Sequence, residues 1–88
     1  VTSSDRESAM ALLKLLEIDT YFELFITKED TELNKPHPEP YLKAYRDLNE
    51  AAENCVIFED SPTGLQAAQT AAPRAIIKAG WYQQRPSL

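Results

Sequence analysis

The stretch Cys55–Gly64 constrains the fold of this chain more than any other part of the sequence. It begins with four apolar residues, Cys55–Phe58, whose β-branched and aromatic character is typical of a buried strand. Two carboxylates, Glu59 and Asp60, follow at once, and the Ser-Pro-Thr run after them is typical of a helix start. This order predicts an α/β sheet with both acids at the carboxyl end of a strand, the edge at which parallel sheets bind ligands.

The two acids are candidate ligands for a metal ion. Mg²⁺ takes oxygen ligands and usually keeps several waters, so adjacent carboxylates at a strand end suit it. An acid in this place can also do no more than cap the next helix. For Asp60 taken alone, both interpretations stay open.

The remaining segments complete an α/β pattern. Ser4 and Glu7 have the spacing of a capping box, which predicts that a helix begins near Asp5. The apolar periodicity that follows predicts a core-facing amphipathic helix that extends to Ile18. Phe22–Thr27 has the composition of a short strand. Further helices are predicted over Pro38–Asn49 and Thr63–Ala72, and a last strand over Arg74–Lys78.

Three details of these elements carry expectations of their own. Tyr41 and Tyr45, one helical turn apart, are expected to pack rather than to bind a ligand. Ala72 is followed by Pro73 where helices often end on glycine, which puts a left-handed cap in doubt. In the exit segment Ala79–Leu88, Trp81 and Tyr82 are expected to be exposed.

Lys35 lies in a proline-rich loop, Asn34–Pro40. Each proline narrows the backbone freedom around it, so the lysine stem leaves a comparatively rigid platform. An ammonium held there can compensate the negative charge of a phosphoryl group and a carboxylate. A lone lysine in a polar loop is more often a surface residue. His37, the single histidine, is expected to be a solvated loop residue, and no zinc site is predicted.

Charge and composition exclude several classes of partner. The net charge of −5 argues against a nucleic-acid surface. Hydrophobic content of 43% and charged content of 26% are ordinary for globular chains. A single cysteine excludes an internal disulfide, and no apolar run approaches the ~18 residues of a membrane span. We therefore expect no nucleic-acid or membrane partner, with a cytoplasmic location as the default.

Three segments together resemble motifs of the haloacid dehalogenase (HAD) superfamily. Asn34–Leu42 resembles its third motif, Phe58–Ser61 with Gly64 resembles its fourth, and Val1–Ser4 resembles its second. The motifs occur in the right order and cover nearly the whole chain. The branch that the chain most resembles holds small-molecule phosphatases and beta-phosphoglucomutase-like enzymes.

The resemblance implies hydrolysis of a small phosphorylated metabolite, such as a sugar phosphate, through an aspartyl-phosphate with Mg²⁺. It gives Thr2 and Ser3 the role of binding the phosphoryl oxygens. Lys35 would bind the phosphate and act as a catalytic residue that clamps phosphate and nucleophile. Asp60 would ligate the metal. Glu59 would assist, either as a ligand itself or by contacting the groups that bind the metal. The implied fold is a partial three-layer, Rossmann-like parallel sheet with helices on both faces.

The nucleophile of this family is an aspartate in an Asp-x-Asp motif, and no such motif occurs in the 88 residues. We therefore expect residues 1–88 to be the C-terminal part of a HAD-like core with motifs two to four. The cap domain, the first motif and the central nucleophile strand would be missing, and this part alone would be inactive. The N-terminal part of the same protein would be its partner.

The missing strand has a structural consequence. Leu24–Thr27 and Cys55–Phe58 would be separated by a gap that leaves backbone amides and carbonyls unpaired. We expect these segments to pair directly, to borrow a partner, or to leave the chain poorly stable.

Alternative functions remain open. One is a sugar phosphate mutase of the beta-phosphoglucomutase type, and another is a degenerate, non-catalytic α/β interaction module. A receiver-like or nucleotide-binding domain is disfavoured, because the chain has no glycine-rich phosphate loop and no acid cluster near its N-terminus.

Overall fold

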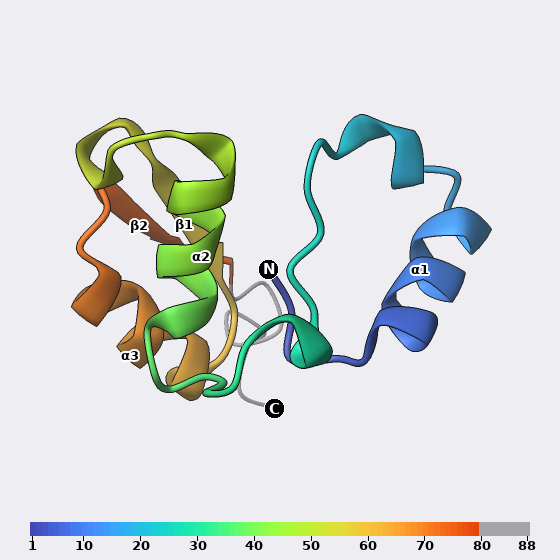
Figure 1. Ribbon diagram of the computed structural model, residues 1–88, viewed down its shortest axis with the longest axis horizontal. Coiled ribbons are helices and arrows are strands. Elements are labelled where there is room, and N and C mark those ends of the chain that lie inside the picture. Colours follow the sequence, from blue (N-terminus) through green and yellow to red (C-terminus); the bar gives the residue numbers. More distant parts are fainter. Residues whose placement is uncertain (80–88) are drawn as a thin grey trace, which may run out of the picture.

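The computed structural model describes residues 1–79, and the expectations for Trp81 and Tyr82 lie outside this range. Figure 1 shows two groups of elements, with α1 on one side and the strands with α2 and α3 on the other. The helices are α1 (Arg6–Leu15), α2 (Glu39–Leu48) and α3 (Pro62–Ala71), and the strands are β1 (Val56–Glu59) and β2 (Ala75–Lys78). Short 3₁₀ turns cover Asp19–Tyr21, Lys28–Asp30 and Ala52–Asn54.

The two strands pair in parallel, with α3 as the crossover between them. Their register runs from Val56 opposite Ala75 to Glu59 opposite Lys78. Side chains alternate along β1, with Ile57 and Glu59 buried and Val56 and Phe58 exposed. The α/β class, both of these strands and the helices α2 and α3 are thereby confirmed.

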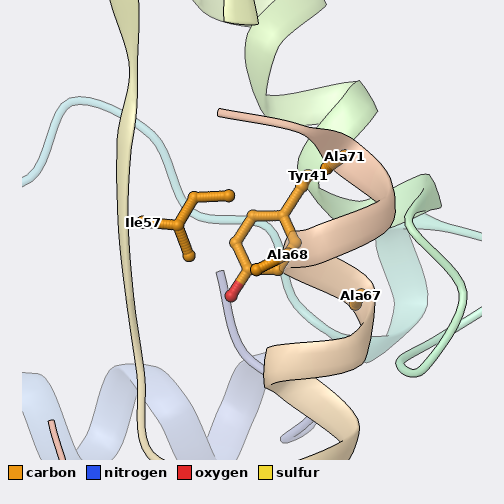
Figure 2. Packing of buried hydrophobic residues seen from close by; sticks show 5 residues of the cluster. All are labelled: Tyr41, Ile57, Ala67, Ala68 and Ala71. Atoms are coloured by element: carbon orange, nitrogen blue, oxygen red, sulfur yellow. The ribbon is translucent and has the colours of Figure 1, made fainter. Parts of the chain in front are cut away.

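The core lies between β1 and the two helices beside it, α2 and α3. Figure 2 shows its five side chains converging there: Tyr41, Ile57, Ala67, Ala68 and Ala71. Ala67 and Ala68 are 0% exposed, and their small side chains allow α3 to approach β1 closely. Tyr45 and Ile76 pack against the same cluster, so the expected packing role of Tyr45 is confirmed.

Helices α2 and α3 both end in the left-handed region. Asn49, at φ 54°, is a residue type that tolerates this conformation. Ala72 adopts φ 51° and ψ 58° and donates its N–H to the Ala68 carbonyl. A left-handed cap therefore forms without glycine, contrary to expectation. The conformation costs an alanine about 1–2 kcal/mol.

The start of α1 differs from the predicted one. Asp5, not Ser4, is the N-cap, and its carboxylate accepts from the Ser8 amide at 3.0 Å. The Ser4 carbonyl instead accepts from the Lys28 amide at 2.9 Å, which joins Ser4 to the start of the Lys28–Asp30 turn. The N-cap of α1 therefore lies one residue later than predicted.

The apolar face of α1 is not buried, and the helix ends at Leu15 rather than at Ile18. Leu12 and Leu16 are each 55% exposed and Leu15 is 79% exposed. The prediction of a core-facing helix is wrong for the described residues, because no sheet among them covers this face.

Phe22–Thr27 does not form the predicted strand. Two backbone hydrogen bonds of 2.9 Å join its end to the N-terminal segment, from Thr2 N to the Ile26 carbonyl and from Lys28 N to the Ser4 carbonyl. A β-strand needs a hydrogen-bonded partner along its whole length, and the N-terminal segment pairs only with the end of this one. Within residues 1–79, β1 pairs with β2 and not with Leu24–Thr27.

None of the helices in residues 1–79 has the length and apolar character needed to cross a membrane.

Candidate active site

A cavity of about 600 Å³ opens at the carboxyl end of β1, beside the start of α3. The N-terminal segment supplies Thr2 and Ser3, the loop before α2 supplies Lys35, and the end of β1 supplies Glu59 and Asp60. The cavity lining is completed by Val1, Ser4, Phe58, Ser61 and Ala79. The structure therefore brings all five sequence-predicted site residues to one cavity.

Lys35 and Glu59 form a buried ion pair. The Lys35 Nζ lies 2.5 Å from Glu59 Oε2, and the two side chains are 9% and 4% exposed. The Lys35–Pro36 peptide bond is cis. Because each charge pairs with the other, neither of these nearly buried side chains carries an unpaired charge.

Tyr41 completes this pair from the first turns of α2. Its hydroxyl donates to the same Glu59 oxygen that accepts from Lys35, and its ring centroid lies 5.1 Å from Lys35 Nζ. The ring is also part of the core, at 5% exposure. Tyr41 therefore packs as expected, and its hydroxyl and ring face also contact the site.

Burial and hydrogen bonding shift the pKa values of Tyr41 and Glu59. Burial, and then the hydrogen bond to Glu59, raise the pKa of Tyr41. For Glu59, burial would raise the pKa, but hydrogen bonds from Lys35 and Tyr41 outweigh it and hold the pKa below its ordinary value. Glu59 is therefore a carboxylate at neutral pH.

Gly64 leaves room for this carboxylate. A Cβ atom at Gly64 would overlap Glu59 Oε1 and its carboxyl carbon. The Gly64 amide donates to Ser61 Oγ at 3.1 Å, which caps α3. The space beside Gly64 is taken by the Glu59 carboxylate.

The other polar residues of the cavity are more open. Asp60 is exposed and directly precedes the Ser61 cap. Thr2 is half-buried, and its hydroxyl accepts from the Ser4 amide at 3.1 Å. Ser3 is exposed on the cavity wall.

His37 does not belong to this lining. It is exposed, and its Nδ1 accepts from the Glu39 amide at 3.0 Å, a local contact at the start of α2. The expectation of an exposed loop residue is confirmed.

Sequence reasoning missed Tyr41 as a neighbour of the site. Apolar periodicity assigned Tyr41 to the core, which is correct but incomplete. A signal was present, because Tyr41 lies in the first turns of the helix that follows the Lys35 loop.

The donor set fits Mg²⁺ in kind but not in number. Carboxylate oxygens are its usual protein ligands. Glu59 is already engaged by Lys35 and Tyr41. In the part of the chain that the structure describes, no cluster of three or more His, Cys, Asp or Glu residues is arranged to hold a metal ion. These residues could therefore supply only part of a coordination shell.

Comparison with known proteins places the chain among hydrolases. The family model described as haloacid dehalogenase-like hydrolase matches residues 1–77. A Caldanaerobacter subterraneus protein named "Putative pyrophosphatase PpaX" is 42% identical over 76 residues, which cover 86% of this chain and 34% of that protein. The Thermotoga maritima "Phosphorylated carbohydrates phosphatase" is 36% identical over 70 residues, which cover 80% of this chain and 32% of that protein.

The fold agrees with these sequence matches. The crystal structure of a "putative beta-phosphoglucomutase" from Thermotoga maritima superposes with a TM-score of 0.79 at 33% identity, over 83% of this chain and 34% of that one. The chain thus spans about a third of the length of these relatives. On the evidence of the family match, the site geometry and the fold, this chain belongs to the haloacid dehalogenase-like hydrolase family.

Proposed function

We propose that this chain supplies part of the active site of a Mg²⁺-dependent phosphatase that hydrolyses a small phosphomonoester such as a sugar phosphate. The observation that carries the proposal is the meeting of Lys35, Glu59 and Asp60 with the Thr2–Ser3 segment around one cavity. Family membership and the names of the relatives, which include a phosphorylated carbohydrates phosphatase, support the same reaction class.

In this proposal the residues act by position and charge, which is the usual division of labour in phosphoryl transfer. The Thr2 hydroxyl and Ser3 bind oxygens of the phosphoryl group. The Lys35 ammonium, fixed by Glu59, faces the negative charge that builds up on the transferring group. Because the pair is nearly buried, its charges are screened less than those of a surface pair.

Asp60 would hold Mg²⁺, and Glu59 would assist as a further ligand or from behind the ligands. When bound, the ion would neutralise phosphoryl charge. The nucleophile would be an aspartate from outside these residues, because none of their five aspartates, Asp5, Asp19, Asp30, Asp47 and Asp60, stands in an Asp-x-Asp motif. Residues 1–88 alone are therefore expected to show no turnover.

A second candidate is a sugar phosphate mutase. The structural match to a protein described as a beta-phosphoglucomutase favours it. Both reactions would use the same phosphoryl-binding residues, and they differ in whether water or a second sugar hydroxyl accepts the phosphoryl group.

The test is an assay of the longer protein that carries these residues, with sugar phosphates and Mg²⁺. We expect Lys35→Met and Asp60→Asn each to lower kcat by about 10²–10³-fold, as for loss of one preorganised charge contact. Lys43→Met is the matched control, because Lys43 pairs with Asp47 on the surface of α2, away from the cavity. We expect it to leave kcat unchanged.

Product analysis separates the two candidates, since a phosphatase releases inorganic phosphate and a mutase returns an isomeric sugar phosphate. Full activity in Lys35→Met would contradict both. Mg²⁺-dependent turnover by residues 1–88 alone, abolished by Asp60→Asn, would contradict the proposal that the nucleophile lies elsewhere.

A further inference from the structure

We propose that Tyr41 is a positioning residue, which fixes the Lys35 ammonium against Glu59 at the cavity through its hydroxyl and its ring at once. The effect on phosphate binding rests on the function proposed above, whereas the effect on Lys35 itself does not.

The first support is that two donors share one oxygen. Glu59 Oε2 accepts from both Lys35 Nζ and the Tyr41 hydroxyl. Rotation of the carboxylate away from Lys35 would therefore break the tyrosine hydrogen bond as well. On its other side the carboxylate lies against Gly64, where no Cβ atom occupies the space. Glu59 is thus held by two donors at one oxygen, in space that Gly64 leaves open.

The second support is the ring face. Lys35 Nζ lies over the Tyr41 ring, 5.1 Å from its centroid, and the lysine side chain is 9% exposed. A lysine stem has four carbon atoms and many rotamers, so its ammonium does not hold one place without help. Cation–π attraction to the ring and the ion pair with Glu59 together select one place. Order that exists before the ligand arrives does not have to be created on binding.

Tyr45 provides an internal comparison. It lies one turn further along α2, packs against the same core and donates its hydroxyl to the Ala71 carbonyl at 3.3 Å. Neither tyrosine is exposed, and each hydroxyl has one acceptor. Only the acceptor of Tyr41 belongs to the candidate site. Loss of a hydroxyl from a packed tyrosine can therefore be separated from loss of a contact to Glu59.

The first experiment observes Lys35 directly in the protein that carries these residues, by NMR of its ammonium protons. In Tyr41→Phe we expect these protons to exchange with water about ten times faster, as for loss of one hydrogen bond to a charged group. In Tyr45→Phe the rate should stay within about twofold of the parent rate. Equal exchange rates in Tyr41→Phe and the parent protein would overturn the proposal.

The second experiment measures dissociation constants for inorganic phosphate in a double-mutant cycle. We expect Tyr41→Phe to weaken binding by about tenfold when Lys35 is present and by less than about twofold in the Lys35→Met background. A purely structural role would give equal losses in both backgrounds, which would contradict a positioning role. If the parent protein binds no phosphate, the proposed function fails, while the exchange measurement still decides the role of Tyr41.

A measurement on the parent protein alone covers the case in which Tyr41→Phe does not fold. The Tyr41 ring should shift the ε-methylene protons of Lys35 upfield and give nuclear Overhauser contacts to them. Unshifted lysine protons without such contacts would overturn the proposal.

Discussion

Different kinds of contact stabilise the two halves of the molecule, residues 1–33 and residues 34–79. Residues 34–79 contain the core, in which Ile57 and three alanines of α3 are buried together with Tyr41. In residues 1–33, by contrast, α1 buries no residue, and only Ile26 and Thr27 are buried in the segment beside it. Figure 1 shows this segment and α1 on the side of the molecule away from α2 and α3.

Polar contacts connect the first half. The Arg6 guanidinium donates to the Phe25 carbonyl at 3.0 Å and to Asp30 Oδ2 at 2.9 Å. The Arg6 amide donates to the Glu29 carboxylate at 2.9 Å. Asp30 in turn accepts from the amide and the hydroxyl of Thr27 at 2.7 and 2.9 Å. A single exposed ion pair such as Arg6–Asp30 contributes little, so this half depends on the ion pair and these hydrogen bonds acting together.

An amphipathic pattern therefore buries an apolar face only where another element packs against it. The alanines of α3 pack against β1, whereas Leu12 and Leu13 of α1 line a largely apolar cavity of about 370 Å³ beside the Phe22–Thr27 segment. The candidate site joins the halves, because Thr2 and Ser3 come from one and Lys35, Glu59 and Asp60 from the other.

The largest effect is expected when one apolar residue in each half is truncated to alanine. Ile57→Ala should cost about 2–5 kcal/mol in the free energy of unfolding, because it removes a side chain that is 6% exposed. Leu15→Ala, at a position 79% exposed, should change it by less than about 0.5 kcal/mol. Urea denaturation followed by circular dichroism measures both. Equal losses would show that α1 is packed as firmly as β1.

A smaller effect is expected at Gly64. Glycine to alanine inside a helix ordinarily stabilises by about 1 kcal/mol. Here the added Cβ atom would overlap the Glu59 carboxylate, so we expect Gly64→Ala to destabilise by about 1–3 kcal/mol. Gln66→Ala, at an exposed position of α3, is the control and should be neutral or slightly stabilising. Stabilisation by Gly64→Ala would mean that Glu59 does not occupy the space beside it.

The smallest loss of stability is expected in residues 1–33, at Asp30. Asp30→Ala should cost about 0.5–2 kcal/mol, as for loss of a helix cap, and should speed hydrogen exchange at the Thr27 amide. Asp47→Ala, which removes a surface pair on α2, is the control and should leave that exchange unchanged.

The same contact has a pH dependence of known sign. Hydrogen bonds from Thr27 lower the pKa of Asp30. Its stabilisation is therefore present above about pH 4, the range of an unfolded aspartate, and is lost as the pH falls through the lowered folded pKa. A cost of Asp30→Ala that does not decrease as the pH is lowered below about 4 would contradict this origin.

The sequence predicted the second half of the fold well and the first half poorly, for a physical reason. Ile57 and the α3 alanines find their partners within the chain, so local periodicity predicted their elements correctly. The Phe22–Thr27 strand and the buried face of α1 needed partners that the described residues do not supply. The place of the acids followed from their position at a strand end, and the meeting of Lys35 with them followed from the resemblance to the HAD motifs. The Tyr41 hydroxyl contact depends on side-chain direction, which periodicity does not encode.

The most direct test of the central claim, that both halves form one phosphate site, is an NMR titration of the protein with inorganic phosphate. We expect saturable shifts of the Thr2, Ser3 and Ser61 amides together with the Lys35 ammonium, and loss of all of them in Lys35→Met. Shifts confined to one half, or shifts that survive Lys35→Met, would contradict the account.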